Sequence, residues 1–169
     1  TRFLYCASGQ LGAQCRPAIA DAFVFDTLRG TWQSLPPLPA PRYAGTMQLL
    51  DNRLHFVGGA KPDRYTPASD HWSLAIEDGR PIENNWRDES PVPRAAMHRG
   101  SAVIGGALYL FGGQQGDFVA ITDDPNYTCT GKTKEAYLAD TYRYCPCEKR
   151  WTRLRDMLVP ASHTDFSVV

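Results

Sequence analysis

The chain has 169 residues, of which 43% are hydrophobic and 21% are charged, a composition typical of a globular rather than a disordered protein. Its 18 basic and 18 acidic residues cancel, so net charge gives no argument for binding to nucleic acid or an anionic membrane. The longest apolar runs have the length of a β-strand, well short of the roughly 18 residues that a membrane-spanning helix needs.

In chain order, three segments carry the same features in the same sequence. Each begins with a short apolar run that ends in glycine and continues through a second apolar run to a tryptophan. A Pro-Arg or Pro-Ala step follows each tryptophan. The glycines are Gly9, Gly59 and Gly113, and the tryptophans are Trp32, Trp86 and Trp151. Short apolar runs of this kind predict β-strands, and such thin units must stack around an axis to bury their faces.

These features resemble kelch repeats, which recur at about 50 residues and form the blades of a β-propeller. Segments 8–15, 35–44, 70–75 and 111–118 are similar to a plant and green-algal group in the galactose oxidase/kelch superfamily. The resemblance implies a β-propeller, in that group often behind an N-terminal membrane anchor, with no reaction assigned to it.

We therefore expect an all-β fold: a partial kelch propeller of about three four-stranded antiparallel blades. The expected units are 1–40, 41–92 and 93–159, with 160–169 starting the next. Propellers close with four to eight blades, so we expect a six- or seven-bladed ring completed by blades from the same or another chain.

Loops that join equivalent strands should project from one face of the disc, and these loops are 10–19, 61–69 and 114–139. The last is a long insert, and inserts often lie on the binding face. The candidate contact residues are Gln14, Arg16, Lys61, Arg64, Asp117, Asp123 and Asp124. Asp123 and Asp124 lack the alternating carboxylates of a calcium loop, so no metal is expected there.

A second candidate site lies at the mouth of the central channel, because His98 and His163 follow the Pro-Arg and Pro-Ala steps. With Arg42, Arg94 and Arg99 they offer a ring for an anionic or sugar ligand. The alternative is structural: Arg42 and Arg94 hydrogen-bond neighbouring blades, and His98 is a structural histidine whose hydrogen bonds are satisfied.

Among the five cysteines, Cys15 and Cys129 lie in loops of the same face, where a disulfide would hold the insert. Cys6 lies within a strand, so we expect it to be buried as a small apolar side chain. A bridge between Cys145 and Cys147 would span a single residue and is expected to be unfavourable. Zinc at that pair would need further ligands, which the neighbouring sequence does not supply.

Asn126 begins an Asn-Tyr-Thr triplet, the acceptor sequence for N-glycosylation. A chance occurrence of such a triplet is the alternative. With the cysteines and the resemblance, it favours the secretory pathway lumen or the extracellular space, with membrane anchoring through a preceding N-terminal segment.

The leading functional interpretation is a non-catalytic protein-interaction or carbohydrate-binding module that needs no cofactor. The alternative is a carbohydrate-active enzyme, mutarotase-like or oxidase-like, at the channel mouth. His98, His163 and Asp165 would then supply acid-base groups. The ligand set of a copper oxidase and the Gly-x-Ser-x-Gly motif of a hydrolase are not found in the sequence. A structural subunit of a larger assembly is a third interpretation.

Overall fold

The computed structural model describes residues 2–13 and 15–164, which form strands and connecting loops without a helix. Three main sheets follow one another along the chain, and we call them blades 1, 2 and 3. Blade 1 contains β1 (Phe3–Ala7), β2 (Ala22–Asp26) and β3 (Thr31–Leu35) in that order. Blade 2 contains β4 (Thr46–Leu50), β5 (Arg53–Val57), β6 (His71–Glu77) and β7 (Arg80–Pro81), and β8 (Arg87–Asp88) also pairs with β6.

Blade 3 has the strand order β16-β15-β10-β9. Its strands are β9 (Gly100–Ile104), β10 (Ala107–Phe111), β15 (Thr141–Cys145) and β16 (Arg150–Arg153). Two short ladders lie between β10 and β15 in the chain. They pair β11 (Gln114–Gln115) with β14 (Ala136–Tyr137), and β12 (Phe118–Ala120) with β13 (Cys129–Lys132).

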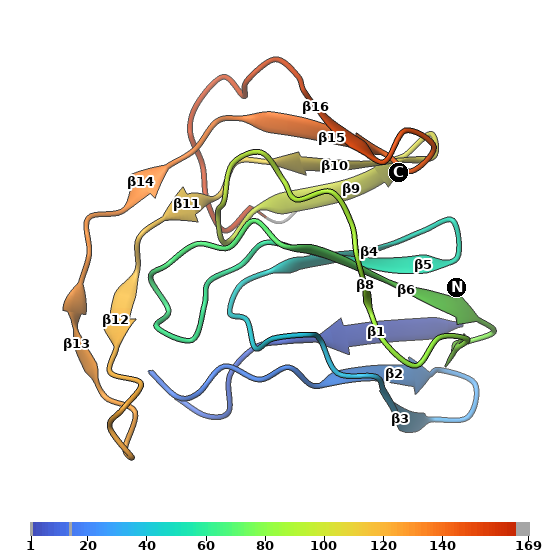
Figure 1. The fold of residues 1–169 in the computed structure, drawn as a ribbon, viewed down its shortest axis with the longest axis horizontal. Coiled ribbons are helices and arrows are strands. Elements are labelled where there is room, and N and C mark those ends of the chain that lie inside the picture. The colour runs from blue at the N-terminus through green and yellow to red at the C-terminus, as the bar shows by residue number, and fades with distance from the viewer. Residues whose placement is uncertain (1, 14, 165–169) are drawn as a thin grey trace.

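The three blades stand beside one another, with blade 2 between blades 1 and 3 (Figure 1). Every paired strand is antiparallel. The predicted all-β partial propeller is confirmed. None of the described residues lies in a helix able to cross a membrane.

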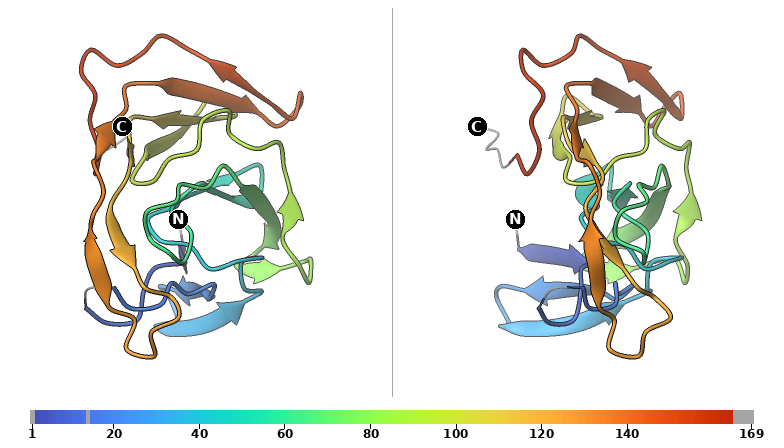
Figure 2. Two further views of the ribbon diagram at one scale, coloured as in Figure 1. Left: turned by 60° about the vertical axis from the view of Figure 1, so that its left-hand side comes forward. Right: turned by 90° about the vertical axis from the view of Figure 1, so that its left-hand side faces the viewer.

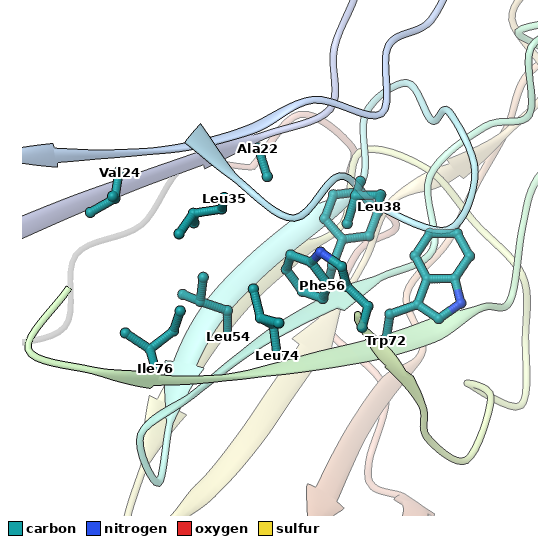
Figure 3. Close-up of a cluster of buried hydrophobic side chains, with 10 residues drawn as sticks. Ala22, Val24, Leu35, Leu38, Leu54, Phe56, Trp72, Leu74 and Ile76 are labelled. Carbon is teal, nitrogen blue, oxygen red and sulfur yellow. The ribbon is translucent and has the colours of Figure 1, made fainter. Parts of the chain in front are cut away.

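Blades 1 and 2 are held together by an apolar core (Figure 3). Alternate side chains of a strand point to the same face, so β5 directs Leu54 and Phe56 toward blade 1. The other labelled members are Ala22, Val24, Leu35, Leu38, Trp72, Leu74 and Ile76. Each large aliphatic or aromatic side chain in such a core contributes about 1.5–3 kcal/mol by leaving water.

The repeated tryptophans connect consecutive blades. Trp86 Nε1 donates a hydrogen bond of 2.8 Å to the Pro36 carbonyl, and Trp151 Nε1 donates one of 2.8 Å to the Ser90 carbonyl. Both accepting carbonyls belong to the segment that leaves the preceding blade. Trp32 has the equivalent position in blade 1, yet its side chain is 58% exposed because the other described blades pack only on the opposite face.

One prediction about this exposed face of blade 1 is wrong. Cys6 was expected to be buried, but it is exposed and free. Along β1, Phe3, Tyr5 and Ala7 pack against the core with blade 2, so Leu4 and Cys6 point the other way.

The repeated glycines allow the blades to approach closely at the channel. Gly9, Gly59 and Gly113 donate backbone hydrogen bonds of 3.1, 3.0 and 2.7 Å to carbonyls of the next blade's entry segment. Within its own blade, Gly59 has φ +90°, and a Cβ there would lie 2.4 Å from the Tyr43 carbonyl oxygen of the segment that enters blade 2. Only glycine combines this backbone conformation with so close an approach.

Candidate functional site: a loop face crossed by an insert

Residues 114–139, the insert predicted from the sequence, form a strap that leaves blade 3 and returns to it. In Figure 1 the strap occupies the left edge, where β11, β12, β13 and β14 run across the ends of the blades. The right-hand view of Figure 2 shows β12 and β13 in front of the loops of blades 1 and 2. We call this surface, formed by residues 10–19, 61–69 and 114–139, the loop face.

The strap is attached to blade 2 through the loop at 61–69. The Ala120 amide donates a 3.0 Å hydrogen bond to the Asp63 carbonyl, and the Tyr127 hydroxyl donates one of 3.1 Å to the Pro62 carbonyl. Arg64 Nε lies 3.4 Å from Asp117 Oδ2, so an ion pair adds to these contacts. The strap is therefore fixed against the middle blade by both backbone and side-chain interactions.

A disulfide between Cys15 and Cys129 attaches the strap to blade 1, with the two Cα atoms 5.6 Å apart. It joins residues separated by 114 positions. Cys15 is buried, and the neighbouring Arg16 carbonyl accepts a hydrogen bond from the Tyr43 hydroxyl. A hollow of about 440 Å³ adjoins the bridge, lined by Gly12, Ala13, Cys15, Arg16, Asn126, Tyr127, Thr128 and Cys129.

The binding-face candidates differ in their surroundings. Arg16, Lys61 and Asp123 are exposed on the loop face, and Arg64 is partly buried in the contacts just described. Asp117 was predicted to be a contact residue but is buried beside Arg64, so it positions the strap instead. Gln14, also a candidate, lies outside the described residues.

Asp124 shapes the tip of the strap. Its carboxylate accepts a 2.8 Å hydrogen bond from the Asn126 amide and one of 2.7 Å from the Thr128 hydroxyl. The hydrogen bond from the Asn126 amide is the main cause that lowers the pKa of Asp124. Asn126 itself is exposed at this turn.

The loop face also carries exposed apolar side chains that were not predicted from the sequence. Leu11 is 67% exposed, Tyr65 38%, Phe118 41%, Ile121 38% and Tyr137 54%. They come from all three loops that the strap brings together. Their position in the sequence could have identified them, because they are apolar residues in loops whose other side chains are mainly polar or charged.

The structure brings the two predicted channel-mouth histidines together. The rings of His98 and His163 stack with centroids 3.7 Å apart, and the His163 amide donates a 3.3 Å hydrogen bond to the His98 carbonyl. Burial, and then the neighbouring His163, lower the pKa of His98 to about 4. A hollow of about 300 Å³ is lined by Ala44, Gly45, His98, Arg99, His163 and Thr164. Asp165, the predicted third acid-base group, lies outside the described residues.

The three predicted arginines connect backbone and side-chain groups of neighbouring segments. Arg42 Nη2 lies 2.5 Å from Asp70 Oδ2, and Arg99 donates 2.8 Å hydrogen bonds to the Gly112 carbonyl and to Asp140 Oδ2. Both arginines are buried. Arg94 is more exposed, with Nη1 3.7 Å from Asp140 Oδ1. Buried arginines with these partners have a positioning role, although Arg99 lines the hollow together with His98 and His163.

A buried polar network between blades 2 and 3 was not predicted. His55 Nδ1 lies 2.8 Å from His71 Nε2, and His71 Nδ1 lies 3.2 Å from the Ser90 carbonyl oxygen. Because the carbonyl accepts, His71 Nδ1 must carry a proton, and His55 Nδ1 must donate to His71 Nε2. Burial is the main cause that lowers the pKa of each histidine to about 4.

Glu89 completes this network. It accepts hydrogen bonds of 2.7 Å from the Ser73 hydroxyl and 2.9 Å from the Tyr144 hydroxyl of blade 3. Burial acts to raise the pKa of Glu89, but these two hydrogen bonds, together with the neighbouring His71 and His55, outweigh it and the pKa is lowered. The strand register explains the arrangement, since Arg53, His55 and Ser73 point away from the apolar core shared with blade 1.

The structure also differs from the expectation for Cys145 and Cys147, between which a bridge was expected to be unfavourable. Cys145 and Cys147 are joined by a disulfide across a single residue, in the turn between β15 and β16. With Glu148 they form the one group of possible metal ligands found among the described residues. A structural zinc site uses four ligands, so this group does not match one.

Comparison with known proteins shows the family to which this architecture belongs. A kelch motif model matches residues 41–93, and a second kelch motif model matches residues 96–158. The chain belongs to the kelch-repeat family. The two matches cover the strands of blades 2 and 3, including the glycines and tryptophans that connect the blades.

Among curated kelch proteins, a kelch repeat-containing protein of Arabidopsis thaliana is 40% identical over 97% of this chain. Kelch-like protein 33 of Homo sapiens is 28% identical over 93% of this chain. The chain spans 38% of the plant relative's length and 25% of the human one. Among solved structures, that of YjhT has a TM-score of 0.64 at 15% identity, covering 86% of this chain and 41% of YjhT. The structural likeness shows the kelch propeller fold.

Proposed function

We propose that this kelch chain is a non-catalytic protein-interaction module that binds its partner on the loop face. The observation that carries the proposal is the set of exposed apolar side chains contributed by all three loops. Aromatic residues are enriched in protein interfaces, and apolar residues gathered on one face mark interaction sites. Arg16, Lys61 and Asp123 supply exposed charges beside them.

Attachment of the strap supports the same proposal. The Cys15–Cys129 disulfide and the contacts with Pro62 and Asp63 hold the strap against two other blades before any partner arrives. Binding then orders little additional backbone, which removes a cost that a free loop of this length would carry.

The test replaces Phe118 and Tyr137 with serine, since both side chains are exposed and their loss leaves the blade cores intact. A matched control replaces Leu28 and Ile104, exposed at the opposite ends of strands in blades 1 and 3. The partner is first captured by chemical cross-linking and identified, and its affinity for purified variants is then measured by calorimetry. We expect a loss of affinity of about 30-fold or more for the loop-face variant, because two interface aromatics each contribute about 1–2 kcal/mol or more.

The control variant should bind like the original chain. Equal affinities of the original chain and the loop-face variant would contradict the proposal. A panel of mono- and oligosaccharides is titrated in parallel. Saturable sugar binding that is lost in the Arg16→Ala variant would indicate that the loop face binds a glycan instead of a protein. Sugar turnover that is lost in the His98→Ala variant would instead support an enzyme at the channel mouth.

A further partner is proposed for the outer face of blade 1, formed by Leu4, Cys6, Phe25 and Trp32. Leu4 and Trp32 are each 58% exposed there, and Phe25 lies against Trp32 with ring centroids 5.0 Å apart. Trp86 and Trp151 bind the preceding blade from this position, so we propose that another kelch blade covers Trp32 in the same way. The greater length of the curated relatives supports such a blade.

We also propose that the chain works in the secretory pathway lumen or outside the cell, where disulfides persist, and that Asn126 is glycosylated. The exposure of Asn126 at the tip of the strap supports this. Expression in a eukaryotic secretory host should give a product whose mass falls by about 2 kDa on treatment with an N-glycan amidase. The Asn126→Gln variant should lack that mass, and an unglycosylated original chain would contradict the proposal.

A further inference from the structure

The Cys145–Cys147 disulfide lies in a hairpin turn that does not depend on it. Pairing of Cys145 with Arg150 fixes the two ends of the turn, and the Glu148 amide donates a 3.3 Å hydrogen bond to the Cys145 carbonyl. The last turn residue, Lys149, has φ +49°. Backbone pairing of β15 with β16 thus already specifies the shape that the disulfide would otherwise impose.

Blade 1 contains the same turn without any cysteine. There Asp26 pairs with Thr31, and Gly30 with φ +66° takes the position of Lys149. The Asp26 carboxylate accepts hydrogen bonds of 3.0 and 3.2 Å from the amides of Leu28 and Arg29. An ordinary polar side chain therefore suffices to close this turn in a kelch blade.

The disulfide also adds little constraint to the chain as a whole. A disulfide stabilises chiefly by restricting the unfolded chain, and the effect grows with the length of the loop it closes. The Cys145–Cys147 bridge spans a separation of 2, whereas Cys15–Cys129 spans 114. The short bridge is thus the less important of the two for stability.

Accessibility and charge favour chemistry at this bridge. Cys147 is exposed and Cys145 is partly buried. In the other disulfide Cys129 is exposed, but Cys15 is only 1% exposed, so neither sulfur of the short bridge is as deeply buried as Cys15. Lys149 and Arg150 are exposed beside the bridge, and nearby positive charge stabilises a thiolate. The Glu148 carboxylate also lies within 4.8 Å of the two sulfurs, but it is paired with Arg150 at 2.7 Å. Exposed disulfides of this kind are typically the labile or catalytic ones.

From these observations we propose that Cys145 and Cys147 form a thiol-disulfide exchange site that accepts two electrons from an external dithiol. A thiolate of the dithiol attacks Cys147 Sγ, which forms a mixed disulfide and breaks the Cys145–Cys147 bond. The Cys145 sulfur leaves as a thiolate. The second thiolate of the dithiol then attacks the mixed disulfide and releases Cys147 as a thiolate. The dithiol is oxidised to a disulfide, the Cys145–Cys147 pair is reduced, and the two protons released by the dithiol protonate the Cys145 and Cys147 thiolates.

The first experiment measures which bridge is reduced. The folded Cys6→Ser variant, which lacks the free thiol, is treated with dithiothreitol. Released thiols are alkylated, and the alkylated cysteines are identified by mass spectrometry over time. We expect Cys145 and Cys147 to be alkylated at least about tenfold faster than Cys15 and Cys129, while circular dichroism stays unchanged. Equal alkylation rates for both bridges, or loss of the circular dichroism signal of the folded chain on reduction of the short bridge, would overturn the proposal.

The second experiment tests exchange in a way that a purely structural bridge would not affect. Catalytic amounts of the Cys6→Ser chain are added to dithiothreitol and glutathione disulfide, and the oxidation of dithiothreitol is followed. The matched variant combines Cys6→Ser with Cys145→Asp and Cys147→Leu, which copies the turn of blade 1. We expect acceleration by the first protein and none by the second, with equal thermal stability. The same rate with both proteins, or no acceleration by either, would refute an exchange site.

Discussion

Replacement of Gly59 by alanine is expected to lower the free energy of unfolding by about 4 kcal/mol. The new Cβ would lie 2.4 Å from the Tyr43 carbonyl oxygen and 2.8 Å from the Gly45 amide nitrogen. Both are backbone atoms, so the clash is relieved only by moving the two strands of the channel apart. That movement would also weaken the 3.0 Å hydrogen bond from the Gly59 amide to Ala96 in the next blade. Urea denaturation followed by tryptophan fluorescence measures the loss.

Gly30 provides the matched control for this prediction. It has φ +66°, so alanine there has the same unfavourable left-handed backbone, but its Cβ would have no atom within 4 Å. The Gly30→Ala variant should therefore lose only about 1–2 kcal/mol. Similar losses in the two variants would mean that the close approach of Gly59 to the Tyr43–Gly45 segment adds nothing to the backbone cost.

Acid is expected to destabilise the chain between pH 6.5 and pH 4. The folded pKa of His55 and of His71 is about 4, below the ordinary value of 6.5 for histidine, so the unfolded chain binds protons that the folded chain does not. The stability that these histidines contribute is complete above pH 6.5 and is lost as the pH falls toward 4. Each shift corresponds to roughly 3 kcal/mol. Denaturant titrations at half-unit pH intervals would measure the decline.

A double variant, His55→Gln with His71→Gln, tests the origin of this decline. It should be less stable at pH 7, because the hydrogen bonds from His71 to the Ser90 carbonyl and from His55 to His71 are lost and only Trp151 still donates to that carbonyl. Its stability should vary less with pH. His98 also has a pKa lowered to about 4, so the His98→Gln variant is measured separately. Below about pH 4.5 protonation of Glu89 adds a further loss, because its folded pKa is lowered. An unchanged pH slope in the double variant would contradict the assignment.

The repeat made the fold predictable from the sequence. Gly59 and Gly113 recur with Trp86 and Trp151 because every blade needs the same close approach and the same wedge against its neighbour. These requirements act within about fifty residues and so leave a periodic pattern. The loops that form the loop face could be predicted for the same reason, since they join equivalent strands.

The individual site residues were harder to predict because their roles depend on contacts between distant segments. Asp117 is polar and lies in a loop, but its burial follows from its ion pair with Arg64, 53 residues earlier. The exposure of Cys6 depends on which face of β1 meets blade 2. The His55–His71 pair arises from the register of β5 with β6, which the sequence did not specify.

Hydrogen exchange on the purified chain, with and without its identified partner, tests most directly whether the strapped loops form the binding surface. Slower exchange on complex formation is expected in residues 10–19, 61–69 and 114–139. Exchange should be unchanged in the turns at the other ends of the strands, 27–30, 78–79 and 146–149. Protection confined to those turns, with the loop face unaffected, would contradict the account.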